Sequence, residues 1–280
     1  MSFTETFSSL CPNVRVTLVS ASPQLKVAHV SSTTGRLMQQ FDVREVPSSS
    51  LIHSHANVDF VMDKVVSLDA EKHQLVTSAG KEVAYTFAVV CTGARPVPIP
   101  GSRSHVLCIR DTQSVSQVQQ SLSNSRRVVV VGNGGIATEL VFKMTHCHIV
   151  WVIRDKSISS AFFDPVSAQF MINSLNEGKK DDSVQPTQTR RFVVSDGDGV
   201  NESKEEPGSA LGPDWCLGRQ FTGRSQQASL IVEYETEVTR VRETSESCEG
   251  QDKEEDYPVV VELSNGKNFP CDVVISATGE

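Results

Sequence analysis

The sequence lacks several features that would assign it to a specialised class of protein. Its 280 residues contain no continuous apolar run approaching the length, about 20 residues, that a membrane-spanning helix requires. Its first residues, MSFTETFSSLCPN, contain neither a basic region nor a long apolar core, so we expect no secretory signal. The net charge is −8, unlike that of a nucleic-acid-binding domain with a basic face. With 38% hydrophobic and 21% charged residues, the composition predicts a globular protein of about two domains.

Paired cysteines are also missing. The seven cysteines are scattered, odd in number and never in C-x-x-C spacing, which is typical of reduced intracellular thiols. The HCH stretch at 146–148 resembles a metal-binding pair, but it runs directly into the apolar residues 149–153, and no second ligand pair follows at a matching spacing. We therefore expect no metal site, no membrane partner and a location inside the cell.

The second half of the chain contains a strand–helix–strand–helix pattern. Apolar strand-like runs at 127–131 and 148–154 alternate with helix-like segments at 136–145 and 165–177. This order is typical of a parallel sheet with covering helices. The sequence therefore predicts an α/β fold.

The first half reads mainly as strands separated by turns. We expect a strand at Val14–Ser22, a short helix at Gly35–Phe41, and several strand-like runs between 57 and 101 with polar turns at Asp69–Gln74 and Ser78–Glu82. A helix at Arg110–Ser125 follows, with Asp111 or Thr112 as its N-cap.

The character of the chain changes from Gly178 to about Asp256. Most of this stretch is charged, rich in serine and poor in apolar residues, which predicts a mobile insertion. Within it, Ser229–Glu243 alternates between apolar and polar residues like a strand. After it, residues 257–279 predict a hairpin with SNGK as its turn, followed by a buried strand.

The motif that carries chemistry is G-x-G-x-x-A, formed by Gly132, Gly134 and Ala137 between a run of valines and a helix. Gly132 permits a tight turn, Gly134 lets the backbone approach a pyrophosphate, and Ala137 lets helix and strand pack closely. The amino end of the helix then offers N–H groups to the phosphates. The alternative is a glycine turn that holds no ligand.

Arg154 follows the second strand, where an NAD-specific site would place an acidic residue, and Asp155 is its neighbour. An arginine there can hold the 2′-phosphate of NADPH, so the sequence favours NADPH. The alternative is a solvated charge at the end of a strand.

Three landmarks in order carry a resemblance to a known family. Residues 88–101, AVVCTGARPVPIPG, resemble the T-G-A-x-P-x-x-P element of the flavin-dependent pyridine nucleotide-disulphide oxidoreductases. Residues 271–279, CDVVISATG, resemble the corresponding strand end that closes their nicotinamide domain, and the glycine motif lies between the two. The resemblance covers essentially the whole chain.

This resemblance implies two nested Rossmann-like domains, the first binding FAD and the second NAD(P)H, with hydride passing from nicotinamide to flavin. It implies a partial FAD-binding domain at 1–120 and an NAD(P)-binding domain at 121–280, with the insertion at about 178–256. Val14–Ser20 resembles the second strand of the flavin domain, no G-x-G-x-x-G precedes it, and the chain stops just after Gly279. We therefore expect a chain truncated at both ends.

The resemblance also implies residue roles. Glu139 matches the family's glutamate near the nicotinamide–flavin contact, so it is the catalytic candidate, the alternative being an acid on a helix surface. Ser20 and Ala21 stand where relatives have the acid that holds the FAD ribose. The implied nicotinamide-nucleotide residues are Gly132, Asn133, Gly134, Gly135, Ile136, Ala137, Arg154 and Gly279, and the implied flavin residues are Val65, Thr92, Gly93 and Ala94.

Residues 22–41 contain no cysteine, so the C-x4-C dithiol of the family's disulphide reductases is absent from this chain. The expected activity is therefore that of an FAD-dependent NAD(P)H oxidoreductase passing electrons to oxygen, a quinone or a protein. One alternative is a flavin-free NAD(P)H-binding module. Another is a redox-sensing interaction protein that docks a partner through GSALGPDW at 208–215, although Trp215 could equally pin the insertion to its own domain. The resemblance implies the cytoplasm and nucleus.

Overall fold

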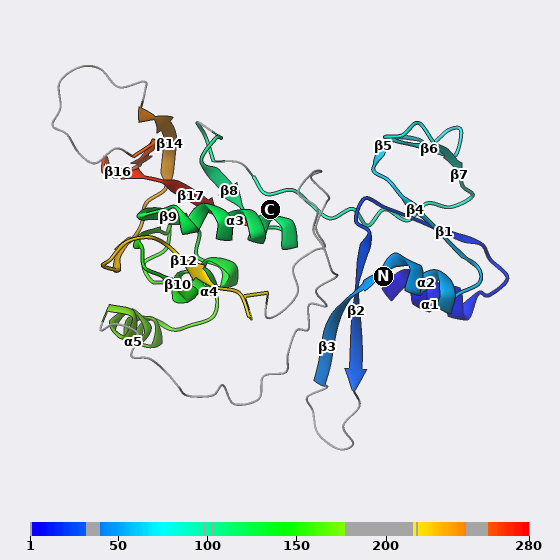
Figure 1. Cartoon of the computed structure of the whole chain (residues 1–280), viewed down its shortest axis with the longest axis horizontal. Coiled ribbons are helices and arrows are strands. Elements are labelled where there is room, and N and C mark those ends of the chain that lie inside the picture. The colour runs from blue at the N-terminus through cyan, green and yellow to red at the C-terminus, as the bar shows by residue number, and fades with distance from the viewer. Residues whose placement is uncertain are drawn as a thin grey trace. The chain divides into compact units, whose positions relative to one another are not determined.

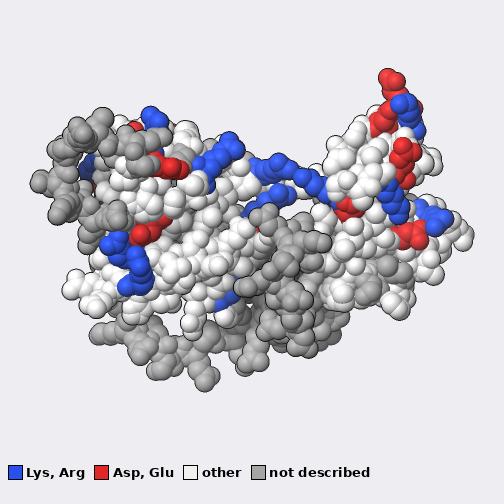
Figure 2. All heavy atoms as spheres, turned by 45° about the horizontal axis from the view of Figure 1, so that its top comes forward, with Lys and Arg blue, Asp and Glu red and all other residues white. Residues whose placement is uncertain are grey.

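The computed structural model describes residues 2–31, 40–97, 99–101, 103–176, 215–216, 218–244 and 257–279. The chain divides into two compact units, drawn in Figure 1; the first is built mainly of residues up to Gly93 and the second mainly of those from Ala94 onward. The domain boundary at residue 120 stays a prediction, and the helix Thr112–Ser123 runs across that residue. Figure 2 shows acidic and basic side chains in small groups of both signs over the face drawn.

The second unit is built on a five-stranded sheet with the order β13-β11-β9-β17-β8, in which every neighbouring pair is parallel. Its strands are β8 (Val106–Cys108), β9 (Arg127–Val131), β11 (His148–Val152), β13 (Ser229–Glu233) and β17 (Val273–Ser276). Val128, Val129 and Val130 are fully buried because the sheet is covered on both faces. The predicted α/β fold with a parallel sheet is confirmed.

The described residues of this unit form the helices α3 (Thr112–Ser123), α4 (Gly135–Lys143) and α5 (Pro165–Asn176). In α3, Val115, Val118 and Leu122 recur at helical spacing and are fully buried. The start of α3 at Thr112 leaves Asp111 in the predicted N-cap position. Two short strands, β10 (Met144–Thr145) and β12 (Phe221–Thr222), pair beside α4.

A three-stranded antiparallel sheet covers one face of the parallel sheet. It consists of β14 (Val238–Glu243), β15 (Val259–Leu263) and β16 (Asn268–Cys271), and the predicted hairpin turn lies between β15 and β16. Val129 and Val131 of β9 share a core with this sheet, while α4 also contacts β9. The glycine turn after β9 is therefore anchored between two covering layers.

The expectation of one strand at Ser229–Glu243 is wrong. Residues 229–233 pair with β11 as the edge of the parallel sheet, and residues 238–243 pair with β15 in the antiparallel sheet. Glu235 has a left-handed backbone with φ 51°, which breaks the strand between the two halves. Alternation of polar and apolar residues continues through such a break, so the pattern alone cannot reveal it. Part of the predicted insertion is therefore core.

In the first unit, the residues that the structure describes form three small sheets. Strand β1 (Val16–Ser20) pairs parallel to β4 (Val58–Met62), and β2 (Gln24–Ser31) pairs antiparallel to β3 (Gln40–Pro47). Two helices, α1 (Ser2–Leu10) and α2 (Ser48–Ser54), complete this part, whose buried core is Leu25, Leu51 and Val58. The helix predicted at Gly35–Phe41 is wrong at its end, because Gln40 and Phe41 pair with β2; residues 35–39 lie outside the described residues.

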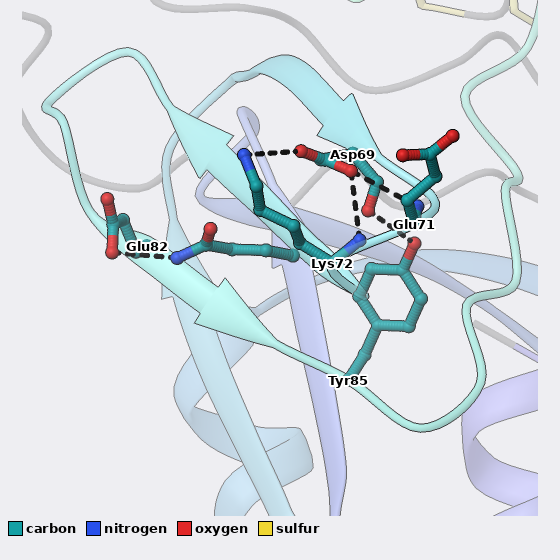
Figure 3. A network of polar contacts seen from close by, with 6 residues as sticks. Asp69, Glu71, Lys72, Glu82 and Tyr85 are labelled. Carbon is teal, nitrogen blue, oxygen red and sulfur yellow. Dashed lines mark hydrogen bonds and ion pairs between the residues drawn. The ribbon is translucent and has the colours of Figure 1, made fainter.

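Figure 3 shows the third sheet, the meander of β5 (Val65–Asp69), β6 (Gln74–Thr77) and β7 (Glu82–Ala84). The carboxylate of Asp69 accepts hydrogen bonds from the backbone N–H groups of Glu71 and Lys72 at 3.1 and 2.9 Å. It also lies 3.1 Å from Nζ of Lys72. The two polar turns predicted between these strands are confirmed.

Residues 86–92 do not form the strand that the sequence predicts. Among the described residues no strand pairs with this segment, and Phe87 is 90% exposed. Apolar residues alone cannot form a strand, because its backbone groups need a neighbouring strand to pair with.

Candidate dinucleotide-binding site

The turn between β9 and α4 contains two glycines with different structural duties. Gly132 has φ 128°, and a Cβ at this residue would lie 2.7 Å from the carbonyl carbon of Ala277 and nearer still to its oxygen. At Gly134 the backbone is extended, with φ −84° and ψ −179°, and an added Cβ would meet nothing within 4 Å. Gly132 therefore serves the packing of the sheet, whereas Gly134 leaves open space in front of the backbone.

Helix α4 starts directly after this open position. Ala137 is fully buried, as close packing of helix on strand requires, and Ile136 is half-buried. Gly135 has the ring of Phe162 at 3.8 Å from the position of an added Cβ. No side chain caps the amino end of the helix. Open backbone next to an uncapped helix start fits the pyrophosphate of a dinucleotide.

Asn133 holds the loop that follows β11, residues 153–164, which we call the β11–α5 loop. Its Nδ2 donates to Oδ2 of Asp155 at 2.6 Å and to the carbonyl of Ser157 at 3.0 Å. Its Oδ1 accepts the backbone N–H of Ser159. The side chain predicted to cradle a cofactor is therefore engaged in fixing the loop beside the turn.

Further contacts tie the same loop to α4. The hydroxyls of Ser159 and Thr138 lie 2.6 Å apart, and Thr138 also donates to the carbonyl of Gly134 at 3.0 Å. Ser159 is fully buried with a left-handed φ of 50°. On the other side of the turn, Nε1 of Trp151 donates to the carbonyl of Gly132 at 2.7 Å. Sequence reasoning missed Thr138, Ser159 and Trp151, because such polar partners carry no motif of their own.

Two opposite charges follow β11. Arg154 is 78% exposed at its side chain, and its Nη1 lies 3.7 Å from Oε1 of Glu237. Such an exposed pair contributes little and leaves the guanidinium able to reorient. Asp155, in contrast, is held by Asn133.

Glu139 is exposed on α4 and has one neighbour that the sequence did not suggest. Its Oε2 lies 3.8 Å from Sγ of Cys216, which is only 4% exposed. Burial first, and then the nearby charge of Glu139, raise the pKa of the Cys216 thiol to about 12. Cys216 lies within the predicted insertion, so this part of the insertion packs against α4. Trp215 beside it is also buried, whereas residues 208–214 lie outside the described residues.

The end of β17 also reaches the turn. The backbone N–H of Ala277 donates to the carbonyl of Val131 at 2.8 Å. Gly279 follows two residues later with φ 87°, and an added Cβ would meet nothing within 4 Å. The structure thus brings Gly132, Asn133, Gly134 and the residues next to them together in one turn. Gly279 is two residues from Ala277, whose N–H bonds to Val131 just before this turn.

The predicted flavin residues are not gathered in this way. Val65 begins β5, and Thr92 and Gly93 lie with Ala94 in an exposed segment without regular structure. Among the described residues of the first unit, no glycine turn joins a strand to a helix. These residues do not by themselves fit the pyrophosphate of FAD.

The HCH stretch has ordinary structural roles. Both ring nitrogens of His148 lie near serine hydroxyls, Nδ1 at 2.8 Å from Ser229 and Nε2 at 3.1 Å from Ser225, and Cys147 is buried. No group of three metal-binding side chains occurs within the described ranges. None of the described helices has the length and apolarity to cross a bilayer.

Comparison with known proteins places these observations in context. Residues 3–179 match the model of the family described as pyridine nucleotide-disulphide oxidoreductase. Curated relatives named pyridine nucleotide-disulfide oxidoreductase domain-containing protein 1 are 36% identical in Danio rerio, over 98% of this chain, and 33% identical in Homo sapiens, over 96% of it. The chain spans 57% of the length of each of these two relatives.

Solved structures share the fold at low sequence identity. An engineered water-forming NADPH oxidase bound to NADPH is 12% identical with a TM-score of 0.60, covering 98% of this chain and 50% of that one. A ferredoxin reductase from Rhodopseudomonas palustris is 17% identical with a TM-score of 0.54, covering 95% and 52% of the two chains.

Proposed function

This chain belongs to the pyridine nucleotide-disulphide oxidoreductase family, and from that premise we propose that it supplies the NAD(P)H-binding part of an FAD-dependent oxidoreductase. The observation that carries the proposal is the open backbone at Gly134, directly before the uncapped start of α4. The pyrophosphate would lie against Gly134 and accept hydrogen bonds from the first N–H groups of α4. Gly132 and Ala137 keep the turn and helix close to the sheet.

The reaction proposed for the assembled oxidoreductase is the transfer of hydride from the nicotinamide to a flavin. Two nested Rossmann-like domains would bring the two cofactors together, and the parallel pair β1–β4 in the first unit is compatible with part of the flavin domain. Glu139 would lie near the nicotinamide, held on α4 beside Cys216. Because the described residues lack a turn for the flavin pyrophosphate, we assign this chain's side chains to nucleotide binding alone.

The electron acceptor proposed is oxygen, a quinone or a protein and not a disulphide. Residues 22–41 contain no cysteine. Burial is the largest cause that raises the pKa of both Cys216 and Cys271 to about 12, which leaves these thiols protonated and unsuited to thiol exchange. Two solved structures with a similar fold are an NADPH oxidase and a ferredoxin reductase, which are oxidoreductases of the proposed kinds.

Arg154 supports a preference for NADPH, because its loosely paired guanidinium can turn toward a 2′-phosphate. Cytoplasm and nucleus are proposed as compartments from the family resemblance alone, and imaging of a tagged full-length protein would check them.

The test measures NADPH binding to the purified chain by titration calorimetry, for the wild type and for the variant Gly134→Val. The valine side chain finds open space in the free protein, so the melting temperature should stay close to that of the wild type. It would occupy the place of the pyrophosphate, so NADPH binding should become undetectable. Unchanged NADPH binding by Gly134→Val would contradict the proposed site.

A second candidate function is a flavin-free NAD(P)H-binding module, which the lack of a flavin turn among the described residues favours. The visible absorption spectrum separates the two functions. A flavin band that bleaches when NADPH is added without oxygen supports the oxidoreductase. A colourless protein whose melting temperature rises with NADPH supports the binding module.

A further inference from the structure

An aromatic ring lies exposed beside the glycine turn. Phe162 is 63% exposed, although large apolar side chains usually find cover. Two of its ring atoms lie 3.8 and 3.9 Å from the position that a Cβ on Gly135 would take. One part of the ring therefore lies against the first turn of α4, while most of its surface faces open space.

The loop that presents this ring is firmly held. The backbone N–H groups of Phe162 and Phe163 donate to the carbonyl of Ser159 at 2.8 and 3.0 Å. Ser159 is fully buried and bonded to both Asn133 and Thr138. Ile158 before it is only 1% exposed. The backbone that carries the ring is thus held by the turn itself, and the ring packs against Gly135.

The position of the ring along the site follows from the order of the fold. In a dinucleotide-binding strand–helix–strand unit the pyrophosphate lies at the helix start, and the adenosine ribose lies at the end of the second strand. Here the second strand is β11, which is followed by Arg154 and Asp155 and then, in the same loop, by Phe162. Phe162 therefore follows, in the chain, the residues that would bind the adenosine ribose, and its ring lies against the first turn of α4.

We propose that Phe162 is the aromatic platform on which the adenine ring of the bound nucleotide stacks. Every nucleobase has a π-face, so a fixed and half-open aromatic ring suits such a contact. Preorganisation matters because a ring that is already fixed loses little freedom on binding. The inference rests on the proposed function, since it assumes that the glycine turn binds NAD(P)H.

The experiment is calorimetric titration of the 280-residue chain with NADPH, and separately with the ADP-ribose 2′-phosphate that lacks the nicotinamide. Phe162→Ala should lower the affinities for both ligands by the same factor, about tenfold, because both contain adenine. Phe162→Trp, which keeps an aromatic surface, should restore affinity to within about twofold of the wild type.

Phe170→Ala is the matched control, because Phe170 is 74% exposed on α5, away from the glycine turn in the chain. It should leave both affinities unchanged, and all three variants should melt close to the wild type.

Three outcomes would overturn the proposal: unchanged affinity in Phe162→Ala, a loss for NADPH but not for the truncated ligand, and tighter binding in Phe162→Ala. In each of these the wild-type chain still binds NADPH, so the proposed function survives. A wild-type chain that binds neither ligand would overturn both.

Discussion

At the scale of single residues, the two glycines of the turn are required for different reasons, one for folding and one for ligand binding. Gly132 is needed by the protein itself, because the backbone of Ala277 occupies the place of a side chain. Gly134 is not needed for folding, since its side-chain position is open. Because folding does not require a glycine at residue 134, we assign this glycine to the binding of the ligand.

Gly132→Ala should destabilise the second unit strongly. The added Cβ would collide with Ala277 at a φ of 128°, which strains the backbone as well, and a loss of about 3 kcal/mol in the free energy of unfolding is expected. Urea denaturation followed by circular dichroism measures it. Gly134→Ala is the control and should change stability by less than about 0.5 kcal/mol. Equal losses in the two variants would contradict the division of roles.

Arg154→Ala should lower the affinity for NADPH by about tenfold and change the affinity for NADH little, because the arginine is proposed to bind the 2′-phosphate. Titration calorimetry with both nucleotides checks this. Lys156→Ala is a matched control, since Lys156 is also exposed and lies 3.9 Å from Glu235. If Arg154→Ala lowers the affinities for both nucleotides equally, the arginine does not bind the 2′-phosphate.

At the scale of elements, the sequence predicted the parts whose pattern is repeated and local. The run of valines in β9, the glycines of the turn and the helix-forming residues of α4 are each local signals, and the structure confirms the strand, the turn and the helix. The break between β13 and β14 was not predictable, because Glu235 interrupts the strand without a glycine or proline. Nor was the contact of Cys216 with α4, which joins residues distant in sequence. For the site, the motif predicted the turn, whereas Phe162 and Ser159 emerge only from how the β11–α5 loop folds back.

The turn between β5 and β6 should loosen in acid. The N–H of Lys72 and its side chain, in that order, hold the pKa of the Asp69 carboxyl below its usual value. The folded state therefore binds a proton less readily than the unfolded state. This stabilisation is present above the unfolded pKa of 3.8 and is lost as the pH falls through the lowered folded value.

Hydrogen exchange of the Lys72 amide, measured from neutral pH downward and corrected for intrinsic rates, should show this loss of protection. Asp69→Asn cannot titrate, so its protection should be independent of pH over the same range. Glu71→Gln changes the neighbouring carboxylate, for which Figure 3 marks no contact with Asp69, and should behave like the wild type. If protection of the Lys72 amide still depended on pH in Asp69→Asn, the pH dependence would not come from Asp69.

At the scale of the whole molecule, the two units differ in how much apolar surface they cover. The second unit has a sheet covered on both faces. In the first, Phe87, Val89 and Val90 are 90%, 58% and 68% exposed in a segment without regular structure. Exposed apolar segments pair readily with other chains.

The isolated chain should therefore self-associate through residues 87–90. Sedimentation velocity over a range of concentrations should show oligomers that diminish in the double variant Phe87→Asp, Val90→Asp. Its melting temperature should hardly change, because both side chains are exposed. Val166→Asp serves as control, since Val166 is 79% exposed on α5. The same oligomer distribution in the double variant would show that another surface is responsible.

The order of the parallel sheet has a consequence during synthesis on the ribosome. Strand β17, residues 273–276, lies between β9 and β8, both of which are made more than a hundred residues earlier. Until β17 emerges, β9 presents an unpaired edge made of consecutive valines, and β8 has no neighbour in this sheet. A nascent chain would carry that unpaired edge while residues 132–272 are made, so chaperone binding to β9 should persist until β17 emerges and then end abruptly.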